Sequence, residues 1–405
     1  MGPQNAGGDA RGELRIGVIG AGAIARAHSV ALTNLPHLYP ELPKRVRLVA
    51  VADVNASLAN ALADRFGYDR VAEDAAALIG APDIDLVVAC LPPTLNRDVV
   101  LAAAAAGKHV VCEKPMATSA AEAETMLRAC QAAGVFHGLG VGYRWSPPLR
   151  AIAKLIDDGE LGTIRSFRAS FMLDYAADPE VPLLWRFQKR LAGGGIAIDT
   201  GYHLVDCARF LVGEIAAVQA LSTTFIAERP LADAGAVGNR GGDGSRSGTR
   251  ETGRVDVEDA AAALLTFENG AYGVLETSRV AVGKRISLQI GVYGSRGSAE
   301  WDLEEPDAFR VCLPGDPSTF GFRRVLMSPA HPGAAELLMA GTDGTSLGWI
   351  GFECAMWREF VAAIAEGRPG SADFTDGVRD SAVVDAWYAA AATGERTAVA
   401  VPAGV

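Results

Sequence analysis

A chain of 405 residues is too long for one typical domain, and its length favours two or three. Apolar residues make up 49% and charged residues 21%, which is typical of a globular protein with an ample core. The formal net charge of -11 argues against a nucleic-acid partner, which normally requires a basic face. No apolar run approaches the roughly 20 residues of a membrane span, so we expect no membrane association.

The six cysteines are scattered singly along the chain. That spacing indicates reduced thiols and not a disulfide framework or a zinc site, so we expect no metal. Residues 1–13 are polar and glycine-rich without an apolar core, which predicts a disordered tail and no signal peptide. A cytoplasmic location is the expectation.

Short apolar runs alternate with helical stretches in the first third of the chain. The runs cover residues 16–19, 46–52, 85–91, 109–112 and 135–141, and Ala-rich amphipathic segments cover 57–66 and 97–106. Continuous apolar strands separated by helices predict a parallel sheet with both faces covered. The fold class is therefore predicted as α/β, with a doubly wound Rossmann domain over residues 14–143.

The pattern changes after Pro147. A predicted helix over 149–158 leads into long alternating runs, and Asn269-Gly270 is a strong hairpin-turn signal between two of them. Two amphipathic helices close the chain. We predict a C-terminal α+β domain over residues 144–405, with a large, mostly antiparallel sheet. Residues 231–254, rich in Gly, Ser and Arg, are predicted to form a flexible insert.

The first predicted strand ends in the glycine-rich turn Gly20-Ala21-Gly22-Ala23-Ile24-Ala25. Gly20 would permit the tight turn, Gly22 would let the backbone approach a pyrophosphate, and the small Ala25 would allow close packing of helix on strand. The helix N-terminus that follows favours phosphate charge. We expect Gly20, Gly22, Ala23 and Ile24 to bind a dinucleotide.

Asp53 ends the second predicted strand. A carboxylate there can accept hydrogen bonds from a ribose 2′-hydroxyl and repel a 2′-phosphate, which favours NAD over NADP. The spacing from the glycines exceeds the usual 20 or so residues, and a Pro-containing loop over 35–44 would absorb the surplus. The other interpretation is a solvated acid at the end of a strand. NAD is the expected cofactor.

Two further segments carry polar side chains where this fold places chemistry. Lys114 follows a buried strand, at the end of the sheet where ligands bind, and could favour a developing alkoxide. Asp199 and His203 are neighbours if a helix begins near Asp199, whose carboxylate could cap that helix or orient the imidazole. His203 could take the hydroxyl proton during hydride transfer. Taken alone, each residue is better explained as structural: a surface lysine, an N-cap and a core histidine.

The chain resembles the Gfo/Idh/MocA family of oxidoreductases almost end to end, from about Leu14 to the last helix. The matching motifs are Gly20-Ala21-Gly22-x-x-Ala25, Ala106-Gly107-Lys108-His109-Val110, Glu113-Lys114-Pro115, and Gly194-Gly195 before Asp199-x-Gly201-x-His203. The resemblance implies that Lys114 and His203 are the catalytic pair and that Asp199 is a substrate-binding or orienting carboxylate. It also implies an open sheet used for contacts between copies, so we expect a homodimer or homotetramer.

The resemblance extends the expected ligand contacts. The full set expected at the cofactor is Gly20, Gly22, Ala23, Ile24, Asp53, Leu91, Pro92, Glu113, Lys114, Arg144, Trp185 and Arg186. The set expected at the substrate is Lys114, Tyr143, Arg186, Asp199 and His203. The chain departs from the family where many members have Pro-Asn-x-x-His, because Pro93 and Asn96 replace the Asn and the His. Cofactor contacts in that loop are therefore expected to differ.

Residues 177–189 and 255–259 look most like the levoglucosan dehydrogenases and related glycoside dehydrogenases of this family. That likeness implies NAD-dependent oxidation of a pyranose ring hydroxyl, usually the 3-hydroxyl, in a small sugar or cyclitol partner. An inositol or cyclitol dehydrogenase and an internal-redox glycosidase, which would show no net NADH, are the alternatives. A cofactor-sensing regulator is more remote, because its catalytic positions would be eroded and Lys114, Asp199 and His203 are all present.

Overall fold

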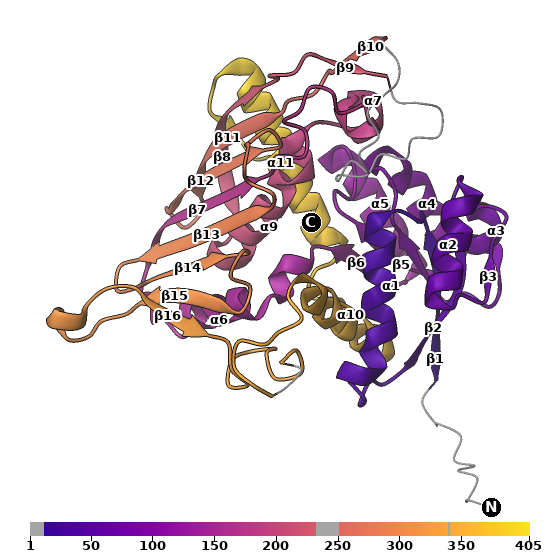
Figure 1. The fold of residues 1–405 in the computed structure, drawn as a ribbon, viewed down its shortest axis with the longest axis horizontal. Coiled ribbons are helices and arrows are strands. Elements are labelled where there is room, and N and C mark those ends of the chain that lie inside the picture. The colour runs from indigo at the N-terminus through magenta and orange to yellow at the C-terminus, as the bar shows by residue number, and fades with distance from the viewer. Residues whose placement is uncertain (1–11, 232–250, 339–340) are drawn as a thin grey trace, which may run out of the picture.

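The structure is a computed structural model that describes residues 12–231, 251–338 and 341–405. The described residues form two large sheets of different kind, each with its own helices, and a small two-stranded sheet of β9 (Glu228–Pro230) and β10 (Thr252–Arg254) (Figure 1). The predicted tail over 1–13 and the predicted insert over 231–254 lie largely outside the described residues. Where they are described, they differ from the prediction: Glu13 belongs to the first strand and Thr252–Arg254 form a strand.

A six-stranded parallel sheet forms the N-terminal part, in the order β3-β2-β1-β4-β5-β6. Its strands are β1 (Glu13–Ile19), β2 (Arg45–Ala52), β3 (Arg70–Val71), β4 (Leu86–Ala89), β5 (His109–Glu113) and β6 (His137–Gly140). Its helices are α1 (Ala23–Leu38), α2 (Ala56–Phe66), α3 (Ala75–Gly80), α4 (Pro93–Ala105) and α5 (Ala120–Ala133). This confirms the predicted doubly wound sheet. The strand order reverses between β1 and β4, where such folds bind ligands.

A nine-stranded mixed sheet forms the C-terminal part, in the order β16-β15-β14-β13-β7-β12-β11-β8-β17. Its strands are β7 (Ile164–Met172), β8 (Ile215–Thr223), β11 (Ala260–Phe267), β12 (Tyr272–Ser278), β13 (Ser287–Gly294), β14 (Ser298–Asp302), β15 (Ala308–Cys312), β16 (Arg323–Leu326) and β17 (Thr397–Ala398). Strands β7 and β12 pair in parallel and the other neighbours pair antiparallel, so the predicted large open sheet is confirmed. Asn269-Gly270 turns β11 into β12, with Gly270 at φ 88°.

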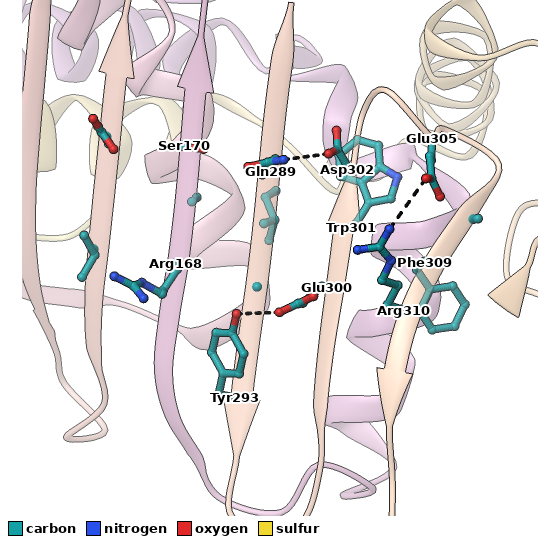
Figure 2. A pocket seen from close by; sticks show the side chains of 16 residues that line it. Arg168, Ser170, Gln289, Tyr293, Glu300, Trp301, Asp302, Glu305, Phe309 and Arg310 are labelled. Atoms are coloured by element: carbon teal, nitrogen blue, oxygen red, sulfur yellow. Dashed lines mark hydrogen bonds and ion pairs between the residues drawn. The ribbon is translucent and has the colours of Figure 1, made fainter. Parts of the chain in front are cut away.

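The two faces of this sheet differ because side chains alternate along each strand. Helices α6 (Pro147–Asp157), α9 (Gly201–Val212) and α11 (Phe374–Thr393) lie on the inner side, where Phe167, Ala169 and Phe171 are buried. The outer face has no covering helix among the described residues (Figure 1). It carries a hollow beside Arg168, Tyr293 and Glu300, in which the Tyr293 hydroxyl donates to Glu300 (Figure 2).

The end of the chain joins the two parts. Helix α10 (Trp349–Glu366) packs against α1, and α11 packs against α5 (Figure 1). One continuous cluster of buried apolar side chains runs through both sheets. The six cysteines are all buried and free, in agreement with the prediction from their spacing. Among the described residues, no helix is long and apolar enough to cross a membrane.

Candidate active site

The glycine turn after β1 has the form that a dinucleotide requires. Gly20 has φ 94°, and a Cβ on it would collide with the Cys90 carbonyl oxygen. A Cβ on Gly22 would meet no described atom within 4 Å, so open space lies before the N-terminus of α1. That first turn has no acidic side chain and no side-chain cap among the described residues. Its backbone N–H groups can therefore receive a pyrophosphate.

Asp53 lies beside this turn, as predicted from its place after β2. One carboxylate oxygen, Oδ2, accepts a hydrogen bond from the Ala21 N–H at 2.7 Å, and Oδ1 accepts one from Asn55 at 2.7 Å. The carboxylate thus fixes the glycine turn to the end of β2. Its negative charge at the turn suits a ribose hydroxyl and opposes a 2′-phosphate.

Lys114 extends from the end of β5 across to the C-terminal part. Its Nζ donates to the backbone oxygen of Asp199 at 2.9 Å and lies 3.3 Å from the carboxylate Oδ1 of the same residue. Only 10% of the Lys114 side chain and 19% of the Asp199 side chain are exposed. The structure therefore brings together two charged residues that are far apart in sequence, in a site largely shielded from water, where their attraction is stronger.

Hydrogen bonds with buried side chains fix the loop that carries Lys114. The Lys114 N–H donates to Glu113 Oε2 at 3.1 Å, and the Glu113 carboxylate bonds in turn to His28 Nε2 at 2.9 Å. The buried Asn96 side chain donates to the carbonyl oxygens of Pro115 and Met116, each at 3.2 Å. Asn96, which replaces the histidine of many family members, thus supports the lysine loop.

Asp199 ends the short helix α8 (Ile196–Asp199), and α9 begins after Thr200. The interpretation of Asp199 as the N-cap of the following helix is wrong, because Thr200 is the N-cap residue and the Asp199 carboxylate lies against Lys114. Oδ2 of Asp199 also lies 3.8 Å from Nε of Arg186. Two cations, one from each part of the molecule, therefore face this carboxylate.

The glycines before α8 allow it to lie close to α11. The Tyr388 hydroxyl accepts from Gly195 N at 3.0 Å and donates to Glu258 Oε1 at 2.8 Å. A Cβ on Gly194 would collide with that hydroxyl. Burial, reinforced by the charge of Glu258, raises the pKa of Tyr388 well above its usual value, so the phenol stays a donor. These contacts fix α8, and with it Asp199.

His203 lies in the first turn of α9 and is half-buried. Its ring meets that of Tyr143 edge-on, with centroids 4.8 Å apart at 82°, and lies 6.0 Å from Phe171 of β7. Tyr143 belongs to the 3-10 turn η1 (Gly142–Trp145) at the junction of the two parts. The His203 imidazole is therefore oriented by two aromatic rings, Tyr143 from the junction and Phe171 from the large sheet.

A pocket opens between the lysine loop and the C-terminal part. Its lining comprises Pro93, Pro115, Trp185, Arg186, Ala192, Gly194, Gly195, Ile198, Asp199 and Arg279. Trp185 and Arg186 lie in the turn η2 (Trp185–Phe187), with the Arg186 guanidinium 4.2 Å above the Trp185 ring. Leu91 and Pro92 are half-buried and directly precede α4. Because β1 and β4 are parallel neighbours, the segment after β4 and the glycine turn after β1 lie at the same end of the sheet.

Two residues that are predicted to contact the cofactor, Arg144 and Glu113, have side chains that bond to other groups of the protein. Arg144 is 6% exposed, and its guanidinium donates to Asp206 at 2.7 Å and Asp376 at 2.9 Å. Burial opposes the charge, yet these carboxylates raise its pKa above the usual value, so Arg144 is committed to a buried ionic network. The Glu113 carboxylate faces His28 and the Lys114 backbone. Both side chains therefore have structural partners within the protein, and their contact with the cofactor stays a prediction.

Sequence reasoning missed Tyr388, Glu258 and Arg279. Tyr388 and Arg279 reach the site from distant elements and belong to no local motif. Glu258 lies in the segment 255–259, where the resemblance carried no role for it. Asn96 carried a signal, since it interrupts a family motif. Among the described residues, no cluster of histidine, cysteine and carboxylate side chains could hold a metal.

A parallel sheet whose glycine turn leaves a helix N-terminus open to a pyrophosphate, together with a shielded lysine after β5 that contacts Asp199, is the arrangement of an NAD-dependent oxidoreductase. Comparison with known proteins agrees. The family profile "Oxidoreductase family, NAD-binding Rossmann fold" matches residues 14–143, and the profile "GFO/IDH/MocA C-terminal domain" matches residues 149–300. The chain belongs to the Gfo/Idh/MocA family.

Several relatives have names that state a sugar or a cyclitol as the substrate. Levoglucosan dehydrogenase of Pseudarthrobacter phenanthrenivorans is 37% identical over 386 residues, or 94% of this chain and 96% of that protein. Inositol 2-dehydrogenase of Rhizobium meliloti is 27% identical, covering 92% of this chain and 95% of its own. A solved structure of levoglucosan dehydrogenase with NADH and L-sorbose matches with a TM-score of 0.90 at 33% identity, over 96% and 100% of the two chains.

Proposed function

We propose that this enzyme oxidises a secondary ring hydroxyl of a pyranose sugar, anhydrosugar or glycoside to a ketone, with the 3-hydroxyl as the position. The observation that carries this proposal is the contact of Lys114 with Asp199 beside the pocket lined by Trp185 and Arg186. Charged groups that can bond to several hydroxyls surround an aromatic ring that can cover an apolar sugar face. A polyhydroxylated ring matches both.

The chemistry divides between the two catalytic residues. NAD, when bound, accepts the hydride. His203 takes the hydroxyl proton, a role that is typically worth about 10²–10⁴ in rate. The Lys114 ammonium stabilises the negative charge that develops on the same oxygen. Asp199 orients Lys114 and accepts a hydrogen bond from a neighbouring substrate hydroxyl, with Tyr143 and Arg186 as further substrate contacts.

Similarity to levoglucosan dehydrogenase supports a pyranose substrate. Similarity to inositol 2-dehydrogenase favours a second candidate, a cyclitol ring. Both carry a secondary hydroxyl on a six-membered ring, so the same catalytic pair serves either.

The test is NADH formation by the purified protein with levoglucosan, glucose, simple glucosides, myo-inositol and scyllo-inositol, each with NAD and with NADP. We expect a pyranoside and NAD to give the highest kcat/KM. Turnover of inositols alone would replace the pyranose with the cyclitol. No NADH with any sugar, while NAD binds, would contradict the dehydrogenase and point to internal redox.

A further inference from the structure

The turn that carries Trp185 and Arg186 rests on a small core of its own. We call residues 175–188 the arm. Buried side chains of the arm pack on the segment that follows the hairpin of β9 (Glu228–Pro230) and β10 (Thr252–Arg254). This core comprises Ala176, Leu184, Phe187, Val255 and Val257, and it is separate from the main core. The position of the arm over the pocket therefore depends on few apolar contacts.

Two buried arginines hold the arm at Phe187. The guanidinium carbons of Arg229 and Arg279 lie over the Phe187 ring, 4.2 Å and 4.6 Å from its centroid. Arg229 donates to backbone oxygens of the arm, at 2.6 Å for Ala176 and 2.9 Å for Asp178. Arg229 thus fixes the start of the arm.

Arg279 connects the end of the arm to the large sheet. It follows β12 directly and is 1% exposed. Its Nε donates to Asp259 Oδ1 at 2.9 Å, and its Nη1 donates to the backbone oxygen of Arg186 at 3.0 Å. Asp259 is itself fixed, since its Oδ2 accepts from the backbone N–H groups of Phe225 and Ile226. The guanidinium is therefore a rigid bridge from the sheet to Arg186.

Stability alone does not account for this bridge. A buried ion pair gains little over well-packed apolar side chains, because desolvation offsets the attraction. Arg279 also lines the pocket that Arg186 and Asp199 line. A planar guanidinium can reach a carboxylate and a carbonyl oxygen at once in fixed geometry, which a lysine ammonium on a flexible stem does less well.

We propose that Arg279 is a positioning residue for substrate recognition: it fixes the backbone of Arg186, so that the Arg186 and Trp185 side chains meet the sugar beside Asp199. This inference rests on the proposed function for its kinetic consequence and on the hydrogen bonds of Arg279 for its structural one. Arg279 acts through Arg186, so the proposal concerns sugar binding; Kd for NAD is measured beside it, because Trp185 and Arg186 are also expected at the cofactor.

The test compares Arg279→Met and Arg279→Lys with wild type. Arg128→Met, on the exposed face of α5, is the matched control. Three quantities are measured: hydrogen exchange of the amides of residues 185–188, KM and kcat for the sugar that wild type oxidises, and Kd for NAD. In Arg279→Met we expect faster exchange in this segment and KM raised about tenfold or more, the scale of a lost charged hydrogen bond. Kd for NAD should rise less than KM does, because the glycine turn also holds the cofactor. Arg279→Lys should lie between, and the control should match wild type.

Unchanged exchange in residues 185–188 of Arg279→Met would overturn the proposal, whether or not the enzyme turns over any sugar. Faster exchange with KM unchanged would also overturn it, because the arm would then have no part in recognition. If Arg279→Met does not fold, Arg279→Lys decides on the same two readouts. If wild type oxidises none of the sugars, the proposed function fails. The hydrogen-exchange data would still test whether Arg279 fixes residues 185–188.

Discussion

Lys114 and Asp53 show how single side chains serve both the chain and its ligands. Lys114 bonds to the backbone and approaches the carboxylate of Asp199, so its ammonium is already placed at a site of low exposure. Asp53 braces the glycine turn through Ala21, and we expect its charge to favour NAD over NADP. Substitutions that keep the shape and remove the charge separate these two roles.

Lys114→Met should lower kcat by about 10²–10³, because the variant loses the cation that stabilises the developing alkoxide. Kd for NAD should stay within about threefold of wild type, since binding relies on the glycine turn. Steady-state kinetics together with a cofactor titration check both values. Turnover near that of wild type in a folded variant would exclude Lys114 from the chemistry.

Asp53→Asn should lower the ratio of kcat/KM with NAD to kcat/KM with NADP by about tenfold or more, because it removes the repulsion of a 2′-phosphate. The asparagine oxygen can still accept from Ala21, so the glycine turn should persist, while the hydrogen bond from the Asn55 N–H is lost. The check is the same assay with both cofactors. An unchanged ratio would mean that Asp53 only braces the turn.

Elements are positioned in this molecule by close backbone approach and by buried polar contacts. Helix α8 lies against the hydroxyl of Tyr388, which only glycine at position 194 permits. A buried cluster joins three other elements: His28 of α1, Glu113 of β5 and Glu353 of α10. The approach of α8 to Tyr388 and the His28–Glu113–Glu353 cluster each join segments that are distant in sequence. A substitution in either one should therefore affect a whole element.

Gly194→Ala should displace α8 and lower kcat/KM for the sugar by about 10² or more, because a small misplacement of Asp199 degrades the reacting geometry. Gly80→Ala is the control: it lies in α3, and a Cβ there would meet no described atom within 4 Å. Activity assays and thermal melts of both variants provide the comparison. Full activity in Gly194→Ala would show that α8 tolerates the shift or that Asp199 needs no such placement.

Glu353 should make stability fall as pH rises. Burial, with the charge of Glu113 adding to it and His28 opposing it, raises the pKa of Glu353 from 4.5 to about 7. Between these values the folded chain holds a proton that the unfolded chain has released, so stability is greatest below pH 4.5 and is lost up to about pH 7. Although burial opposes its charge, Glu113 and Glu353 raise the pKa of His28, which contributes in the same direction.

Glu353→Gln keeps the shape and removes this titration. We expect its unfolding free energy, relative to wild type, to improve by about 3 kcal/mol between pH 5 and pH 8. Denaturant unfolding of both proteins across that range measures the difference. Parallel pH curves would show that Glu353 does not titrate as its surroundings imply.

At the scale of the whole molecule, the sequence pattern predicted the architecture because it depends on periodicity. Alternating apolar runs and helices predicted the Rossmann sheet, and Asn269-Gly270 predicted the turn between β11 and β12. Short elements such as β3 and β17, two residues each, carry too little pattern to be recognised. Helix α4 starts earlier than predicted because Pro93 suits the first turn of a helix.

The site was predictable where it follows local motifs and hidden where it depends on packing. Gly20, Asp53, Lys114, Asp199 and His203 all stand out in sequence. The binding of Arg144 to Asp206 and Asp376 was not predictable from the sequence, because those carboxylates come from α9 and α11. Distant partners of this kind follow only from the three-dimensional packing.

The expected homodimer or homotetramer stays a prediction. The outer face of the large sheet supports it, because Leu221, Leu264 and Tyr272 are each more than half exposed there. An exposed apolar patch of this kind commonly marks a contact with another protein.

The proposed reaction is tested most directly by following the hydrogen on carbon 3 of the sugar. Levoglucosan deuterated at carbon 3 is incubated with the enzyme and NAD, and the reduced cofactor is analysed by mass spectrometry. We predict that the deuterium appears in the NADH, with slower turnover of the labelled sugar if hydride transfer limits the rate. NADH without the label would show that another carbon is oxidised, and no reduced cofactor from any pyranoside would contradict the central claim.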